Sequence, residues 1–243
     1  MNLHARPGEA VVDALCGRPS AHYPKEGDQD SAARAAPARP RSLSAHPPGR
    51  AGSGGAADAL GKLTSAAESR DGYDRAKFRH WNTGEDAADG CDTRQEVLLS
   101  EAVEAPAVGP GCALTGGRWL SYHDGQALTS ASALDIDHMV PLAKAWNSGA
   151  SAWTPARREA YANDQRAPAS LVAVTARSNR QKADQDPAQW LPSAAHQHCR
   201  YAAEWVGTKL RWSLTADPAE LESLKVFAGG PCEETIVVVT PAG

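Results

Sequence analysis

The sequence lacks the two features that most simply indicate a membrane protein or a polybasic nucleic-acid wrapper. No apolar run approaches the roughly 18 residues that a helix needs to cross a membrane. The 25 basic residues are outnumbered by 29 acidic ones, so the formal net charge is −4. Any contact with nucleic acid must therefore depend on a local basic patch. At 243 residues, the chain is long enough to bury the core of one good-sized domain.

The first 60 residues are poor in aromatic side chains, and Tyr23 is the only one among them. They hold 7 of the 17 prolines, whereas all seven tryptophans lie between Trp81 and Trp212. Such a composition cannot bury enough apolar surface to offset the entropy lost on ordering. We therefore expect residues 1–62 to be an unstructured or leader segment of near-neutral charge, and residues 63–243 to form the domain. The start also lacks the apolar stretch of a secretory signal peptide.

The cysteines follow no C-x-x-C pattern, which argues against a structural zinc site. Cys16 is interpreted as an incidental tail cysteine. The other four fall into two pairs, Cys91 with Cys112 and Cys199 with Cys232. Disulfides at these pairs would each stabilise the fold by roughly 3–4 kcal/mol. They are slightly favoured over reduced core thiols, although they require an oxidising compartment.

The remaining sequence predicts an α+β domain, mostly helical, with a small antiparallel sheet. Asp124-Gly125 predicts a β-hairpin turn, and residues 94–99 indicate a helix start or a short strand. Strands are expected at 134–137 and 171–174, and helices at 141–146, at 156–162 and from near Ser178. Asp186-Pro187 and Asp217-Pro218 predict two further helix starts, with Glu220 completing a capping box at the second. One helical face, interpreted as a packing stripe, carries Tyr201, Trp205, Lys209 and Trp212.

The residues best suited to chemistry lie between Asp135 and Asp186. Carboxylate and amide oxygens such as those of Asp137 and Asn179 are hard ligands suited to Mg²⁺ or Mn²⁺. His138 can take a proton from water near neutral pH, and Lys182 lies one helical turn from Asn179. Together, a metal, a base and a cation can hydrolyse a phosphodiester. Taken singly, each residue is better explained as a cap, a surface group or a satisfied core residue, and strand alternation puts Asp137 and His138 on opposite faces.

In combination, these residues resemble a known family. The stretch Leu134-Asp135-Ile136-Asp137-His138-Met139-Val140-Pro141, then Asn163, Leu171-Val172-Ala173-Val174 and Ser178-Asn179-Arg180-Gln181-Lys182 is similar to the HNH, or ββα-metal, endonuclease core. Flanking segments at 90–94, 185–192 and 199–201 narrow the resemblance to the GmrSD-type HNH domain found in many actinobacterial proteins. The resemblance covers roughly residues 70–232, with the core at about 134–186.

The resemblance implies a role for each matching residue. His138 would be the general base, and Asp137 and Asn179 would bind a divalent metal, with Mg²⁺ or Mn²⁺ expected. Asn163 would brace the loop that orients the histidine, and Lys182 would contact the phosphate or the transition state. Asp135 would contact the metal ligands without binding the metal itself. The implied reaction leaves a 5′-phosphate and a 3′-hydroxyl.

Local charge agrees with a nucleic-acid substrate. Residues 157–182 contain six basic and two acidic residues. Within this segment, phosphate contacts are expected from Arg157, Arg158, Arg177 and Arg180. A solvated charged helix remains the alternative for Arg157 and Arg158. Since no base-reading module is visible, the substrate is expected to be DNA, with RNA open, and sequence specificity is expected to be low.

Two other functional classes stay open. One is an inactive nucleic-acid-binding or cell-surface module, and the other is a nuclease subunit of a restriction or toxin system with an immunity or specificity partner. A monomer without membrane association is expected. The family resemblance and the cysteine pairs favour a secreted protein, while the missing signal stretch favours the cytoplasm.

Overall fold

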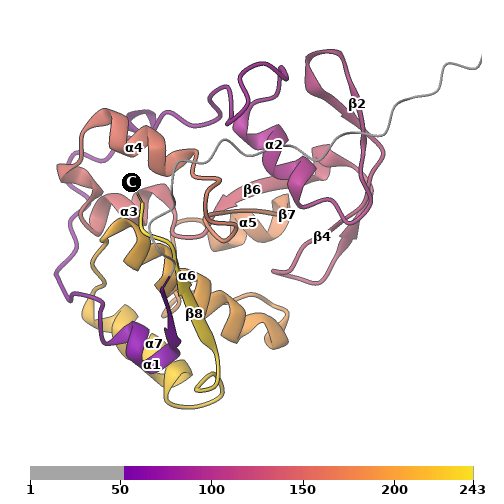
Figure 1. Cartoon of the computed structure of the whole chain (residues 1–243). Helices are drawn as coiled ribbons and strands as arrows, with labels where there is room; N and C mark the ends of the chain where they lie inside the picture. The colour runs from indigo at the N-terminus through magenta and orange to yellow at the C-terminus, as the bar shows by residue number, and fades with distance from the viewer. Residues whose placement is uncertain (1–51, 243) are drawn as a thin grey trace, which may run out of the picture. The chain divides into compact units, whose positions relative to one another are not determined.

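The computed structural model describes residues 52–242 and shows an α+β fold (Figure 1). Within these residues, the strands pair into four antiparallel two-stranded sheets. They are β1 (Gly52–Gly55) with β8 (Ile236–Val239), β2 (Ala107–Gly109) with β3 (Ala113–Thr115), β4 (Trp119–Leu120) with β5 (Ala127–Leu128), and β6 (Leu134–His138) with β7 (Leu171–Thr175). None of the helices in this range has the length and apolar content needed to cross a membrane.

The β6–β7 pair is the sheet on which the candidate site is built. Residues 134–138 lie opposite residues 171–175, so that Asp137 pairs with Val172 and His138 with Leu171. Every residue of β7 is buried, as its unbroken apolar run predicts for a strand covered on both faces. Helix α5 (Ala176–Lys182) follows β7 directly and packs on both strands. Its first turn is capped by Thr175, whose Oγ1 accepts a hydrogen bond from the Ser178 amide.

Four further helices supply half of the buried residues of the main core. They are α3 (Leu142–Asn147), α4 (Pro155–Ala162), α6 (His198–Trp212) and α7 (Pro218–Ala228). Thr154 and Asp217 cap α4 and α7 just before their prolines, as predicted. The predicted stripe on α6 is confirmed, since its four members are buried. Short 3-10 turns lie at 75–77, 110–112, 131–133, 150–152 and 195–197.

A second, smaller core lies on the other side of the β6–β7 pair. Leu134 and Ile136 pack there with Val97 and Leu98 of α2 (Thr93–Ser100) and with Trp119. The predicted hairpin turn at Asp124-Gly125 is confirmed, with β4 and β5 on either side. The segment 94–99 is helical, because Asp92 forms a capping box with Gln95.

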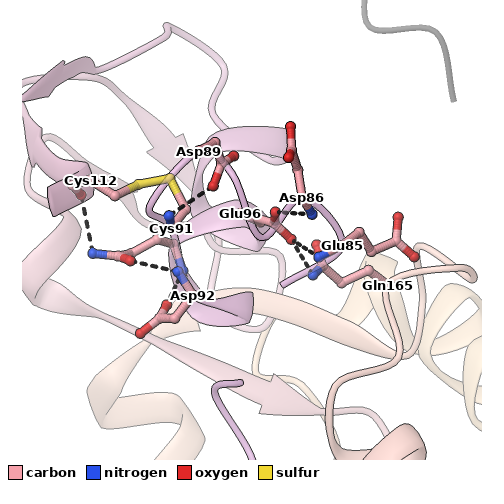
Figure 2. Close-up of a disulfide and its surroundings, with 9 residues drawn as sticks. Glu85, Asp86, Asp89, Cys91, Asp92, Glu96, Cys112 and Gln165 are labelled. Carbon is pink, nitrogen blue, oxygen red and sulfur yellow. Dashed lines mark hydrogen bonds between the residues drawn. A yellow bond between two sulfur atoms is a disulfide. The ribbon is translucent and has the colours of Figure 1, made fainter. Parts of the chain in front are cut away.

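Both favoured disulfides are present, Cys91–Cys112 and Cys199–Cys232. The first joins the segment before α2 to the turn before β3, beside Glu96 (Figure 2). The Glu96 carboxylate accepts hydrogen bonds from the Glu85 and Asp86 amides and from Gln165 Nε2. The buried carboxylate of Glu96 therefore holds residues 85–86 and Gln165 against α2.

The predicted unstructured segment 1–62 extends too far. Residues 1–51, with Cys16, lie outside the described residues, but residues 52–55 form β1 and Ala56–Leu60 form helix α1. The glycine-rich β1 needs only backbone hydrogen bonds to pair with β8. Ala56, Ala59 and Leu60 are buried in the main core, and α1 packs on α6 and α7.

Two capping predictions at acidic residues were wrong in part. Asp186-Pro187 begins a turn and not a helix, since Pro192 follows closely and disfavours helical backbone at Leu191. The Glu220 carboxylate does not complete a capping box. It binds Trp205 Nε1 and Lys209 Nζ instead, because a charged group buried in the core requires partners there.

Candidate functional site

A cleft of about 350 Å³ opens at the end of β6. Three of the predicted site residues share it, namely Asp137, His138 and Asn179. The other lining residues are Arg70, Tyr73, Arg75, Ile136, Pro141, Leu142, Ala143, Ala183 and Asp184. Although strand alternation separates Asp137 from His138, both border this cleft where the strand gives way to the turn before α3.

The imidazole of His138 is held in one orientation and one tautomer. Its Nε2 lies 2.9 Å from the Ala162 carbonyl oxygen. Because a carbonyl only accepts hydrogen bonds, Nε2 carries the proton and Nδ1 keeps a free lone pair. The ring is stacked between Trp81 and Tyr161, at centroid distances of 5.6 and 6.3 Å. Burial lowers the pKa of His138 to about 3, so the ring is neutral at physiological pH.

Asp137 is fixed by an ion pair with Lys182. Lys182 Nζ lies 2.5 Å from Asp137 Oδ2 and 2.8 Å from each of the backbone oxygens of His138 and Met139. Burial raises the pKa of Asp137 to about 6, an effect that the Lys182 charge opposes. Burial also lowers the pKa of Lys182. One ammonium thus holds both the carboxylate and the turn that follows it.

Asn179 is oriented by Asp135. Asn179 Nδ2 donates to Asp135 Oδ2 at 3.2 Å. Since the carboxylate can only accept from an Asn179 N–H, the amide oxygen of Asn179 points elsewhere. Asn179 and Lys182 project from one face of α5 onto the same side of β6, as their spacing predicts. The oxygens of Asp137 and Asn179 on one cleft are a donor set that fits a hard divalent cation.

Asn163 braces a loop that packs against the imidazole. Its Nδ2 donates to the backbone oxygens of Arg79 and Glu159, and its Oδ1 accepts from the Asn82 amide. The loop held between residues 79 and 82 carries Trp81, which stacks on His138. Asn163 therefore acts on the imidazole through this loop and not by direct contact.

Three predicted substrate contacts do not face the cleft. Lys182 has no exposed surface and is saturated by three acceptors. Arg158 is buried and donates to the carbonyls of Lys77, Ala150 and Trp153. Arg157 packs over the rings of Trp153 and Trp212. Lys182 and Arg158 are buried with hydrogen bonds that offset the cost of burial. Arg157 is half-buried and is held by its aromatic contacts.

Arg177 and Arg180 are exposed on α5. They do not line the cleft, so the phosphate contacts expected of them stay a prediction.

The prediction from sequence missed the wall formed by residues 70–75. Arg70, Tyr73 and Arg75 line the cleft from this segment, which has no regular periodicity to mark it. It also missed His123, which is fully buried with Nε2 3.7 Å from Asp137 Oδ2. Burial lowers the pKa of His123 to about 3, so that it faces Asp137 as a neutral ring.

A separate group of acidic residues contains Glu68, Asp217 and Glu220. Lys144 Nζ lies 2.9 Å from Glu68, 2.9 Å from Asp217 and 3.3 Å from Glu220. It also lies 2.6 Å from Asp186 Oδ2. The lysine ammonium occupies the position that a metal would need, so this cluster is a buried ion-pair network.

Comparison with known proteins places these features in a family. Residues 112–225 match the family model described as "GmrSD restriction endonucleases, C-terminal domain". A protein from Arthroderma benhamiae named "Uncharacterized secreted protein" is 41% identical over 155 residues, which cover 64% of this chain and 74% of that relative. The chain belongs to the GmrSD C-terminal domain family. No solved structure matches the chain.

The GmrSD match contains β6, β7, α5 and the predicted residues of the cleft, and it relates the chain to nucleases of restriction systems. The segment with Arg70, Tyr73, Arg75 and Trp81 lies outside the match. In this GmrSD-type domain, the cleft is therefore completed by residues that precede the matched region.

Proposed function

We propose that this protein is a metal-dependent HNH endonuclease that hydrolyses DNA with low sequence specificity. The observation that carries the proposal is the shared cleft of Asp137, His138 and Asn179, built on two antiparallel strands and the helix that follows them. We assign β6, β7 and α5 as the ββα-metal core, within an HNH domain beginning near β1. Family membership supports a nuclease function.

His138 serves as the general base in this proposal. The Ala162 carbonyl fixes the proton on Nε2, and Nδ1 is the atom that accepts a proton from water. The stacked rings of Trp81 and Tyr161 keep the imidazole from rotating away. A base fixed in this way has little reorganisation left to undergo when the reaction begins.

Asp137 and Asn179 would hold the divalent cation, with Asp135 and Lys182 setting their orientation. When bound, such an ion supplies positive charge to the phosphate and leaving oxygens. Hydrolysis forms a bond from the water oxygen to phosphorus and breaks the bond from phosphorus to the 3′-oxygen. The water proton passes to His138 Nδ1, and the 3′-oxygen takes a proton from solvent. The products are a 5′-phosphate and a 3′-hydroxyl.

The proposal is tested by incubating supercoiled plasmid with the protein and Mg²⁺ or Mn²⁺. We expect nicking that EDTA abolishes and that His138→Ala and His138→Asn each slow by about 10²–10⁴-fold, the usual cost of losing a general base. His196→Ala is the matched control, because His196 is exposed on the turn before α6. Thermal unfolding of each variant separates lost chemistry from lost folding.

Other outcomes identify the alternatives. Retention of DNA without cleavage at any metal concentration would indicate an inactive binding module. Cleavage that appears only with a partner protein would indicate a subunit of a restriction or toxin system. Nicking by both His138 variants at the wild-type rate would contradict the assigned base. RNA in place of plasmid tests the second substrate class.

We further propose that the protein acts outside the cytoplasm. Two disulfides join four of its cysteines, and such bonds persist mainly in oxidising compartments. The name of the Arthroderma benhamiae relative also describes a secreted protein. Cell fractionation with detection of the native chain tests this proposal.

A further inference from the structure

Because Lys182 is buried, another residue would have to bring to the phosphate the positive charge that was expected from Lys182. Two other basic residues line the cleft, Arg70 and Arg75. The Arg70 guanidinium lies 2.8 Å from Asp184 Oδ2, and its Nε donates to Asn147 Oδ1 at 2.8 Å. Its charge is therefore neutralised by an acidic residue of the same cleft.

Arg75 differs from Arg70 in its surroundings. It is exposed, and within residues 52–242 it forms no ion pair with a carboxylate. Its side chain hydrogen-bonds that of Tyr73, and its positive charge opposes the rise that burial causes in the pKa of Tyr73. The same charge adds to the effect of burial in lowering the pKa of His138, which places the guanidinium near the imidazole. Arg75 is thus an uncompensated cation on the wall of the cleft.

The segment that carries Arg75 is anchored at both ends. Trp146 Nε1 donates to the Asp71 carbonyl oxygen at 3.0 Å. Phe78 has no exposed surface and packs against Trp146 and Tyr161. Tyr161 is the same ring that stacks on His138. The backbone of this wall is therefore held by the side chains that also position the proposed base.

A cap fixes the short turn between these anchors. Asp74 precedes the 3-10 turn at Arg75–Lys77, and its Oδ1 accepts from the Ala76 amide at 2.8 Å. Lys77 Nζ donates to the Gly72 oxygen at 2.6 Å and closes the segment on itself. Arg75 is the basic residue of this turn that these contacts leave available to a ligand.

We infer that Arg75 binds the scissile phosphodiester and stabilises the negative charge that develops on its non-bridging oxygens. This inference rests on the proposed function and names the residue that supplies the role first assigned to Lys182. A guanidinium suits it because two N–H groups can meet two phosphate oxygens. A preorganised donor of this kind acts mainly on the transition state.

The first experiment measures plasmid nicking by Arg75→Ala and Arg75→Lys, with Arg118→Ala as the control. Arg118 is an arginine of the β-hairpin region that pairs with Glu104 away from the cleft. We expect Arg75→Ala to lower kcat by about 10²–10³-fold with a smaller change in KM, and Arg75→Lys to recover part of the loss. Unchanged kcat in Arg75→Ala would overturn the inference.

The second experiment uses a readout that does not depend on turnover. A short fluorescein-labelled DNA duplex is titrated with His138→Ala protein in EDTA, with and without Arg75→Ala. We expect weaker binding and a slope of log affinity against log salt that is smaller by about 1, the loss of one phosphate contact. An identical slope overturns the inference even if the wild-type protein proves unable to cleave, an outcome that would contradict only the proposed function.

Discussion

Lys182 holds its partners too firmly to serve a substrate. Its ammonium has no exposed surface and satisfies Asp137 and two backbone oxygens. The contribution of such a buried ion pair to folding stability is seen when one of its two charged residues is removed. Removing one partner leaves the other buried and uncompensated, which usually costs about 3–5 kcal/mol.

We therefore expect Lys182→Met to lower the free energy of unfolding by about 3–5 kcal/mol. Adding Asp137→Asn should restore part of that loss, because no buried charge then remains unpaired. Arg177→Ala, on an exposed position of the same helix, should change stability by less than about 0.5 kcal/mol. Urea unfolding measures all of these variants. A stable Lys182→Met protein that had lost only cleavage would instead support direct phosphate contact.

Residue chemistry could be predicted from the sequence more readily than residue environment. The resemblance to the HNH core implies that Asp137, His138 and Asn179 lie together, and all three line one cleft. The burial of Lys182 follows from the approach of α5 to the turn after β6, which no local pattern encodes. Arg75 comes from a segment whose position depends on distant contacts to Trp146 and Tyr161.

At the scale of elements, the sequence predicts helix starts and turns correctly where a capping side chain bonds to residues that follow it closely in the chain. Thr154 and Asp217 begin helices because their side chains accept from amides within the next three residues. Residues 52–60 could not be predicted in the same way, because β1 depends on pairing with β8 at the far end of the chain.

One side chain links the end of α2 to the β6–β7 sheet. Glu101 follows α2, and its Oε2 accepts from the Ala173 amide of β7 at 2.7 Å. Burial raises the pKa of Glu101 to about 7 from its usual 4.5. Between pH 4.5 and about pH 7, the Glu101 carboxyl is therefore protonated to a greater extent in the folded protein than in the unfolded chain. Stability therefore falls as pH rises through this window.

We expect Glu101→Gln to remove this fall in stability at higher pH, because glutamine does not ionise. Its side-chain oxygen can still accept a hydrogen bond from the Ala173 amide. The variant and the wild type should be equally stable near pH 4, and at pH 8 the variant should be more stable by about 1–2 kcal/mol after allowing for solvent screening. Denaturant unfolding across this range measures the difference. Glu104→Gln, whose carboxylate pairs with Arg118 at the surface, serves as control. A constant difference between variant and wild type across the pH range would contradict the shifted pKa.

At the scale of the molecule, neither disulfide crosslinks the β6–β7–α5 unit. Cys91–Cys112 lies before α2 and β3, and Cys199–Cys232 joins the start of α6 to the segment after α7. The two bridges thus constrain the surroundings of the site, while the cleft residues are held by hydrogen bonds, stacking and the buried ion pair. Loss of a bridge should therefore affect unfolding more than the geometry of the folded cleft.

Reduction should accordingly lower stability without altering the chemistry of molecules that remain folded. On the chain-entropy model, each bridge contributes about 3–4 kcal/mol by limiting the unfolded chain. A Cys16→Ser background prevents exchange with the fifth cysteine, and Cys91→Ser/Cys112→Ser is compared with Cys199→Ser/Cys232→Ser. We expect each pair to shift the urea midpoint downward, with kcat at low temperature within about twofold of wild type because no cleft contact is removed. An unchanged midpoint in both double variants would show that the bridges do not stabilise the fold.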